Sequence, residues 1–149
     1  MAGDLVLIDS NVLIRWVHPE GVDFRSVIAS VRSIEIQQDI PCFTSQNFGE
    51  FWNVLTRPEN RNGYGLTPEE ALVRAEKVES KFRLLSDSPE IYYEWRKILV
   101  DYRVSGVQVH DARLVAAMHV HGVKRILTFN TKDFARFDRI EAIHPADLS

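Results

Sequence analysis

The chain has 149 residues, of which 45% are hydrophobic and 26% are charged. This composition is typical of a globular protein and argues against a disordered chain. The apolar runs are too short to span a bilayer, and the first residues have no basic region before an apolar stretch, so neither a membrane segment nor a signal peptide is expected. The single cysteine excludes a disulfide framework and a multi-cysteine zinc site. We therefore expect one cytoplasmic domain over residues 1–149.

The charge balance restricts how this chain can meet nucleic acid. Eighteen lysines and arginines oppose 21 aspartates and glutamates, which gives a formal net charge of −3. A domain that binds phosphates without sequence preference is usually basic. Any contact with nucleic acid should therefore use a local patch, metal ions or a partner protein.

The first half of the chain alternates short apolar runs with helical patterns. The apolar run at residues 5–8 predicts a buried strand, and the polar residues 9–11 that follow favour a turn and a helix cap. Helices are then predicted at residues 12–17 and 22–38, a short strand at 41–44 and an amphipathic helix at 45–55.

The second half continues this alternation. After a loop at residues 60–65, Thr67 and Pro68 begin a helix with the pattern of a capping box. The elements predicted after that are a strand at 83–85, a helix from Ser88 to about Tyr102, a helix at 111–121, and strands at 125–129 and 140–143. This alternation predicts an α/β fold, with a parallel sheet covered by helices on both faces.

Acidic and amide side chains follow the predicted strands, where ligands bind to sheets of this kind. Asp9 follows the first strand, Glu50 lies after the second, Asp111 begins a helix, and Asn130 and Asp133 follow the strand at 125–129. Two charges about 4 Å apart repel by about 4 kcal/mol at an effective dielectric of about 20. A divalent cation relieves this repulsion, and oxygen ligands suit Mg²⁺ or Mn²⁺.

Each acid also has a simple structural interpretation. Asp9 and Asp111 are also suited to capping a helix, and Asp133 to a turn. Glu50 lies opposite the apolar stripe of its helix, where a solvated side chain is expected. Asp111 shares the apolar stripe of its own helix, where a solvated charge is not expected.

Several other functional classes are disfavoured. The sequence contains no glycine-rich dinucleotide loop, Walker loop or Gly-x-Ser-x-Gly elbow. His110, His119 and His121 are expected at the surface or at the edge of the core, because their spacing does not bring them together on one helix face. Cys42 is expected to be a small core residue.

Four stretches together resemble the motifs of PIN domains, in the branch of VapC-type toxins. They are LIDSNVLI at residues 7–14, EFW at 50–52, HDARL at 110–114 and LTFNTKDF at 127–134. The resemblance extends from about residue 5 to residue 143. It implies a three-layer α/β/α PIN-like fold with a central, mainly parallel sheet.

The resemblance also implies a metal-dependent ribonuclease that hydrolyses RNA phosphodiester bonds. Its catalytic acids fall on Asp9, Glu50 and Asp111, with Asp133 in support. Asp9 and Asp111 would hold Mg²⁺ or Mn²⁺, with Glu50 acting directly or through water, and one or two ions fit this pattern. Such an ion activates water and stabilises charge on the phosphate.

Further residues take supporting roles by the same resemblance. Ser10 matches the hydroxyl residue near the metal, and Asn130 is a candidate amide that orients a ligand. Either Asn130 or Asp133 completes the site. Basic residues near the motifs are candidates to hold flanking phosphates, with ordinary solvated side chains as the alternative: Arg57, Arg61, Arg113, Lys132 and Arg136.

The leading functional hypothesis is the toxin of a type II toxin–antitoxin pair. It predicts a homodimer, an antitoxin protein as partner and RNA as substrate. The alternatives are a housekeeping PIN nuclease of RNA processing and a non-catalytic PIN module that binds RNA or protein. A phosphoacceptor domain ranks lower, because position 11 is asparagine where the second aspartate of such a pair would stand.

Overall fold

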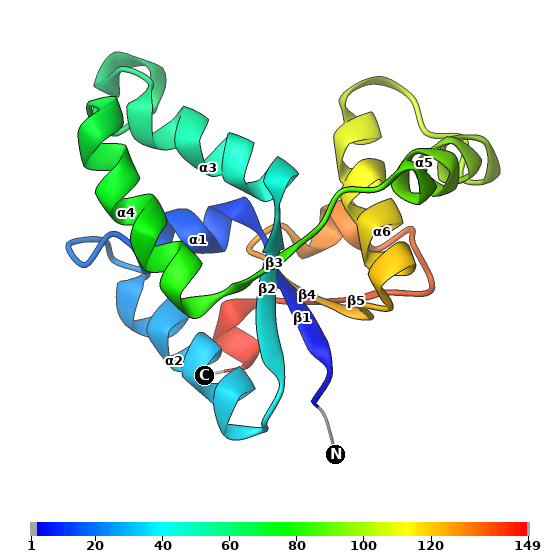
Figure 1. The fold of residues 1–149 in the computed structure, drawn as a ribbon, viewed down its shortest axis with the longest axis horizontal. Coiled ribbons are helices and arrows are strands. Elements are labelled where there is room, and N and C mark those ends of the chain that lie inside the picture. Colours follow the sequence, from blue (N-terminus) through cyan, green and yellow to red (C-terminus); the bar gives the residue numbers. More distant parts are fainter. Residues whose placement is uncertain (1–2, 149) are drawn as a thin grey trace.

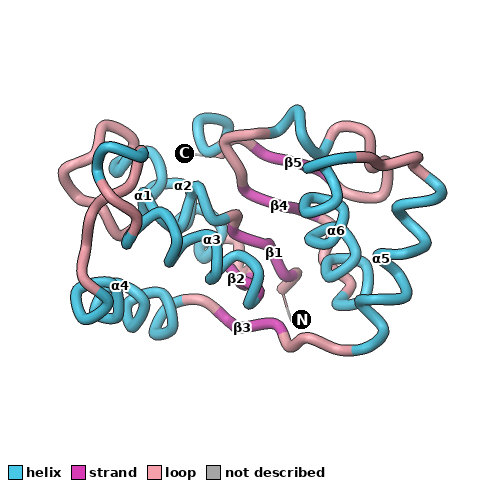
Figure 2. Tube along the Cα trace, turned by 90° about the horizontal axis from the view of Figure 1, so that it is seen from above, coloured by secondary structure: helices cyan, strands magenta, loops and turns pink. Residues whose placement is uncertain are grey.

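The computed structural model describes residues 3–148 and contains a five-stranded parallel sheet. The strands have the order β3-β2-β1-β4-β5, so the first strand lies at the centre (Figures 1 and 2). The strands are β1 (Leu5–Ile8), β2 (Ile40–Thr44), β3 (Arg83–Leu85), β4 (Arg125–Leu127) and β5 (Glu141–Ile143). All four strand pairings are parallel. The predicted α/β class is confirmed.

Helices cover both faces of the sheet and complete three layers (Figure 1). The helices are α1 (Ser10–Trp16), α2 (Phe24–Ile36), α3 (Ser45–Thr56), α4 (Pro68–Lys81), α5 (Pro89–Asp101) and α6 (Val109–His121). The first four lie on one face, while α5 and α6 pack together on the other. Among residues 3–148, no helix is long and apolar enough to cross a membrane.

Strand β1 is buried from both sides, which explains its unbroken apolar sequence. Val6 and Ile8 pack into the core beneath α1–α4, whereas Leu7 packs into the core beneath α5 and α6. This follows from the alternation of side chains along a strand. All three side chains have no exposed surface. The last residue of β1 is thereby fixed, and with it the position of the residue that follows.

Helix starts are set by local hydrogen bonds. The Thr44 side chain accepts from the Asn47 N–H, and the Asn47 side chain accepts from the Thr44 N–H, so a capping box begins α3 directly at the end of β2. Thr67 and Glu70 form the predicted capping box of α4. On α3, the buried face consists of Asn47, Phe51 and Leu55. The spacing of apolar residues in the sequence predicts a stripe of Phe48, Trp52 and Leu55 with Phe51 beside it. The observed buried face is rotated from this stripe, because Phe51 and Leu55 are fully buried whereas Phe48 and Trp52 are only partly buried.

Two differences between the predicted and the observed boundaries affect the candidate site. Strand β4 ends at Leu127 rather than at Phe129, because the Phe129 N–H donates to the side chain of Asn11 at 3.2 Å instead of continuing the sheet. Helix α6 begins at Val109, so Asp111 lies inside its first turn. The interpretation of Asp111 as the cap of this helix is therefore wrong.

Candidate active site at the carboxyl end of the sheet

A cavity of about 640 Å³ lies beyond the carboxyl ends of the central strands. Its lining comes from the end of β1, from α1, α3 and α6, and from the segment after β4. This is where the topology of a parallel sheet places ligand sites. Most of the residues singled out in the sequence line it: Asp9, Ser10, Glu50, Arg57, Asp111, Asn130 and Asp133.

Asp9 is the most buried acid of the cavity, with 6% of its surface exposed. Its Oδ1 accepts from the Ser10 N–H at 2.8 Å, and its Oδ2 accepts from the Thr128 hydroxyl at 2.8 Å. Burial raises the pKa of Asp9 to about 6; the two hydrogen bonds oppose this rise, and the charges of Glu50 and Asp111 add to it. Asp9 is also the N-cap of α1. The capping interpretation is therefore correct, and it does not exclude a role in the cavity.

Thr128 and Asn11 hold the Asp9 carboxylate in place. The Thr128 side chain is fully buried, and besides donating to Asp9 it accepts from the Asn11 amide at 3.2 Å and from the Asn130 N–H at 3.0 Å. The Asn11 amide also lies 3.4 Å from Asp9 Oδ2. Sequence reasoning missed both residues. A threonine within the apolar run at 126–129 was the available signal, because a buried hydroxyl needs a partner.

Glu50 is exposed on α3 and is tethered from two sides. The Ser10 hydroxyl donates to Glu50 Oε2 at 3.2 Å, and the Gln46 amide lies 3.4 Å from Oε1. The same amide donates to the His110 carbonyl at 2.8 Å, which connects α3 to α6 across the cavity. Gln46 was also missed. Its position four residues before Glu50 on a helix was the available signal.

Asp111 is half-buried in the first turn of α6, a helix that lies on the opposite face of the sheet from α3 (Figure 1). Burial is the main cause that raises its pKa to about 6, followed by the negative charges of Asp133 and Glu50, while His110 opposes the rise. The negative charge of Glu50 raises the pKa of both Asp9 and Asp111. Asp9, Glu50, Asp111 and Asp133 thus form one group of carboxylates that repel one another.

The donor set of this group fits a hard divalent cation. Carboxylate oxygens are the ligands that Mg²⁺ and Mn²⁺ prefer, and a cation removes the charge repulsion that adds to the effect of burial on the two pKa values. Among residues 3–148, no three histidine, cysteine, aspartate or glutamate side chains already stand in a closed ligand arrangement. Binding would therefore require the carboxylates to draw together on the ion.

The candidate basic residues do not all lie at the cavity. Arg57 lines it. Arg113 instead stacks over the ring of Trp95, with its Cζ 5.9 Å from the ring centre, and lines a different cavity. The others are exposed and lie outside the lining: Arg61, Lys132 and Arg136.

Solved structures of toxin–antitoxin proteins share this fold. VapBC2 from Rickettsia felis, bound to a DNA fragment from its promoter, matches with a TM-score of 0.70 at 10% identity, over 94% of this chain and 98% of that chain. DNA-bound VapBC from Salmonella typhimurium matches with a TM-score of 0.69 at 16% identity, over 96% and 98%. VapC20 from Mycobacterium tuberculosis, a toxin that cleaves the sarcin–ricin loop, matches with a TM-score of 0.63 at 14% identity, over 89% and 95%.

Sequence comparison gives the family directly. No protein of curated function matches this sequence. The sequence profile of the PIN domain matches residues 6–140, which contain all six α-helices, the strands β2, β3 and β4, and three of the four residues of β1. The sheet order, the acidic cavity and this match agree, and the chain belongs to the PIN domain family.

Proposed function

We propose that this protein is a metal-dependent endoribonuclease and the toxin of a type II toxin–antitoxin pair. The observation that carries the proposal is one cavity lined by Asp9, Glu50, Asp111 and Asp133, with a fifth acid, Asp23, paired with Arg15. The pKa values of Asp9 and Asp111 are raised to about 6. Membership of the PIN family and the likeness to VapC20, a toxin that cleaves an RNA loop, support it.

The proposal gives the residues of the cavity distinct tasks. Asp9 and Asp111 hold the cation, and Glu50 joins them directly or through water. When bound, Mg²⁺ or Mn²⁺ supplies an activated water and stabilises negative charge on the phosphate. The Thr128 hydroxyl and the Ser10 N–H fix the orientation of the Asp9 carboxylate, and the Ser10 hydroxyl directs Glu50 toward the same space.

Asp133 and Asn130 complete the outer part of this site. Both line the cavity and follow the end of β4, with Asp133 on the short helical turn Thr131–Phe134 and Asn130 directly before it. The charge of Asp133 acts on Asp111. We propose that Asp133 helps to hold the cation and that the Asn130 amide orients its ligands.

The test is RNA cleavage as a function of metal. Purified protein should cleave a mixed single-stranded RNA in Mg²⁺ or Mn²⁺, stop when a chelator is added, and resume when Mg²⁺ is restored. Far-UV circular dichroism in chelator should show an intact fold, so that loss of activity reports loss of the ion. Robust cleavage by metal-free protein would contradict the metal-dependent mechanism. RNA binding without cleavage would favour a non-catalytic binding module.

An antitoxin and a second copy of the chain are the proposed partners. Exposed apolar side chains on α4 and on the edge strand β3, Leu72, Val73 and Leu84, provide surface for such contacts. Co-expression with the product of an adjacent small open reading frame should give a complex that no longer cleaves RNA. Light scattering should give the mass of a dimer for the toxin alone. A clean monomer at micromolar concentration would contradict the dimer, and active nuclease in the complex would favour a housekeeping enzyme.

A further inference from the structure

The cavity continues well beyond the acids. It follows α1 from Ser10 and continues past the end of this helix to His18, and it follows α3 from Glu50 to Arg57, the C-cap residue. The two helices pack against each other. A hydrogen bond of 3.2 Å between Ser10 and Glu50 marks the acidic end. A helix rises by 1.5 Å per residue, so the six steps from Ser10 to Trp16 carry α1 roughly 9 Å away from the acidic end, and His18 lies two residues beyond Trp16. The cavity is therefore an elongated groove with two ends of different chemistry.

The far end is aromatic and cationic. Arg57, Asn53 and Asn62 line it together with His18 and Tyr64. The His18 and Tyr64 rings meet edge to face, with their centres 4.8 Å apart and their planes at 69°. Such an aromatic pair with adjacent amides and a guanidinium provides a stacking surface, polar edges and a positive charge.

Arg57 is the cation of this end that remains available. Its Nη2 donates to the Asn62 carbonyl at 3.0 Å, and within residues 3–148 it forms no ion pair. Its Nε is buried and has no hydrogen-bond partner in the same part of the chain. Arg15, the other guanidinium of the groove, is instead paired with Asp23 at 3.2 Å.

The loop after α3 holds Arg57 and Tyr64 rigidly. A Cβ atom at Gly63 would lie 2.0 Å from the Arg57 carbonyl oxygen and 2.2 Å from its Cγ, so only glycine allows this close packing. The Gly65 N–H donates to the Arg57 carbonyl at 2.9 Å, and the Tyr64 N–H donates to the Val54 carbonyl at 3.0 Å. The backbone that carries Arg57 and Tyr64 is thus held in place before any ligand binds, which reduces the entropic cost of binding.

We propose that this far end is a nucleotide subsite for single-stranded RNA. The Arg57 guanidinium binds a phosphate, and Tyr64 with His18 packs against the base of a nucleotide in the same strand as the scissile bond. Guanidinium groups bind phosphate through paired N–H donors, and aromatic side chains stack unpaired bases. The inference rests on the proposed ribonuclease function, because the groove leads directly from the acids to this end.

Binding to short single-stranded RNA tests the subsite. Fluorescence anisotropy is measured in Ca²⁺, with a gel to check that the RNA stays intact, for wild type, Arg57→Gln and Tyr64→Leu. Each variant should bind about 10-fold more weakly. Arg57→Gln should also reduce the slope of log affinity against log salt by about 0.7, as expected for one lost phosphate contact on a single strand, and Arg57→Lys should restore that slope.

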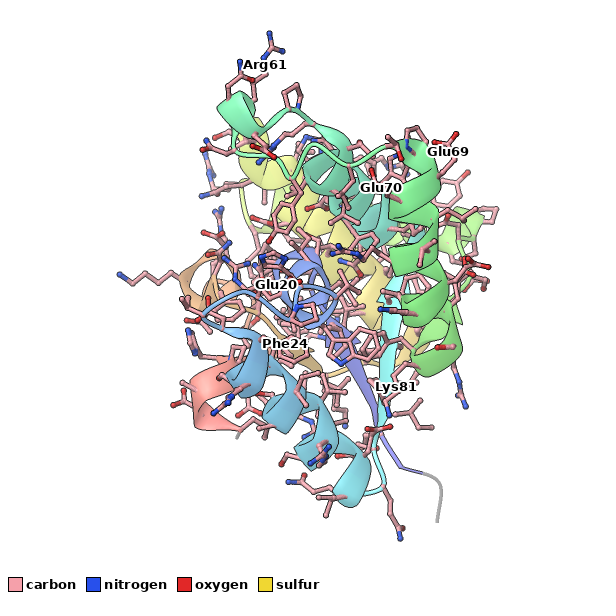
Figure 3. The ribbon with its side chains drawn as sticks, turned by 90° about the vertical axis from the view of Figure 1, so that its left-hand side faces the viewer. Glu20, Phe24, Arg61, Glu69, Glu70 and Lys81 are labelled. Atoms are coloured by element: carbon pink, nitrogen blue, oxygen red, sulfur yellow. The ribbon has the colours of Figure 1, made fainter. Side chains whose placement is uncertain are left out.

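Matched controls come from the same surface. Arg61→Gln removes one charge from the same loop, but Arg61 projects into solvent outside the groove (Figure 3). Tyr93→Leu removes a tyrosine that is 58% exposed on α5. Both should bind RNA within about twofold of wild type. Thermal melts of all variants check that the fold is kept.

Substitution of single nucleotides by abasic ones tests the stacking without altering the protein. One abasic position should weaken wild-type binding about 10-fold and leave Tyr64→Leu unaffected, since the variant no longer stacks that base.

The outcomes separate the subsite from the nuclease. If no abasic position weakens binding, or if both variants bind like wild type while cleavage is normal, the subsite is wrong and the nuclease stands. Normal RNA binding with weakened binding of the antitoxin would make the far end a protein contact and also overturn the subsite. The expected binding pattern without cleavage in Mg²⁺ would contradict the nuclease and keep the subsite.

Discussion

Asp111→Asn should lower RNA cleavage by orders of magnitude and leave the metal-free protein at least as stable as wild type. The substitution keeps the shape of the side chain but removes one charge from a group whose repulsion, together with burial, raises the pKa of Asp111 to about 6. Relief of that repulsion should add about 1 kcal/mol to the free energy of unfolding in chelator. Cleavage falls because the cation loses a ligand that it needs in the transition state.

Thermal melts in Mg²⁺ and in chelator, together with one RNA assay, measure both effects. Mg²⁺ should stabilise the wild type by mass action and the variant less. Asp101→Asn, which changes an exposed carboxylate at the end of α5 outside the cavity lining, is the matched control and should behave as wild type. Equal metal-induced shifts and equal cleavage in Asp111→Asn would remove Asp111 from the site.

The metal-free protein should lose stability as the pH rises from about 4 to above 6. Asp9 has a pKa of about 6 in the folded protein, above the value of about 3.9 expected in the unfolded chain. Its protonated form therefore favours folding, so its contribution is fully present below pH 4 and is lost as the pH passes 6. A shift of this size in a buried acid corresponds to about 3 kcal/mol. Asp111 changes stability in the same direction.

Urea unfolding in chelator between pH 4 and pH 8 measures this effect. Other groups also change the free energy of unfolding with pH. The hydrogen bond from Arg125 is the main cause that lowers the pKa of Asp39, so the contribution of Asp39 to stability is lost as the pH falls. The difference in the free energy of unfolding between wild type and Asp9→Asn isolates the contribution of Asp9. This difference should change by about 3 kcal/mol across this range. Mg²⁺ should flatten the wild-type curve above pH 6, because it binds the ionised form. A difference that does not depend on pH would contradict the raised pKa.

Much of the framework could be predicted because it is encoded locally. The apolar run of β1 and the capping box at Thr67 depend on residues within one turn or one strand, so their patterns are visible in the sequence. The acids that line the cavity were also predictable, because parallel strands bring their carboxyl ends to one edge of the sheet.

The missing parts depend on contacts between distant residues. Thr128 donates to Asp9 from 119 positions away, and Gln46 reaches the His110 carbonyl from 64 positions away. No periodicity records such contacts. The position of Arg113 near Asp111 in the sequence predicts a phosphate contact at the cavity, but the turn of α6 directs Arg113 toward Trp95. Proximity in sequence misled there because neighbouring residues on a helix face different directions.

The central position of β1 also has a consequence for synthesis on the ribosome. Val6 lies opposite Pro41 of β2 on one side and opposite Arg125 of β4 on the other. Asp9 is made before Asp111 and before Thr128, whose hydroxyl orients the Asp9 carboxylate from 119 positions away. A nascent chain therefore lacks an assembled site until Thr128 has been made, and the proposed nuclease cannot act on RNA before that point.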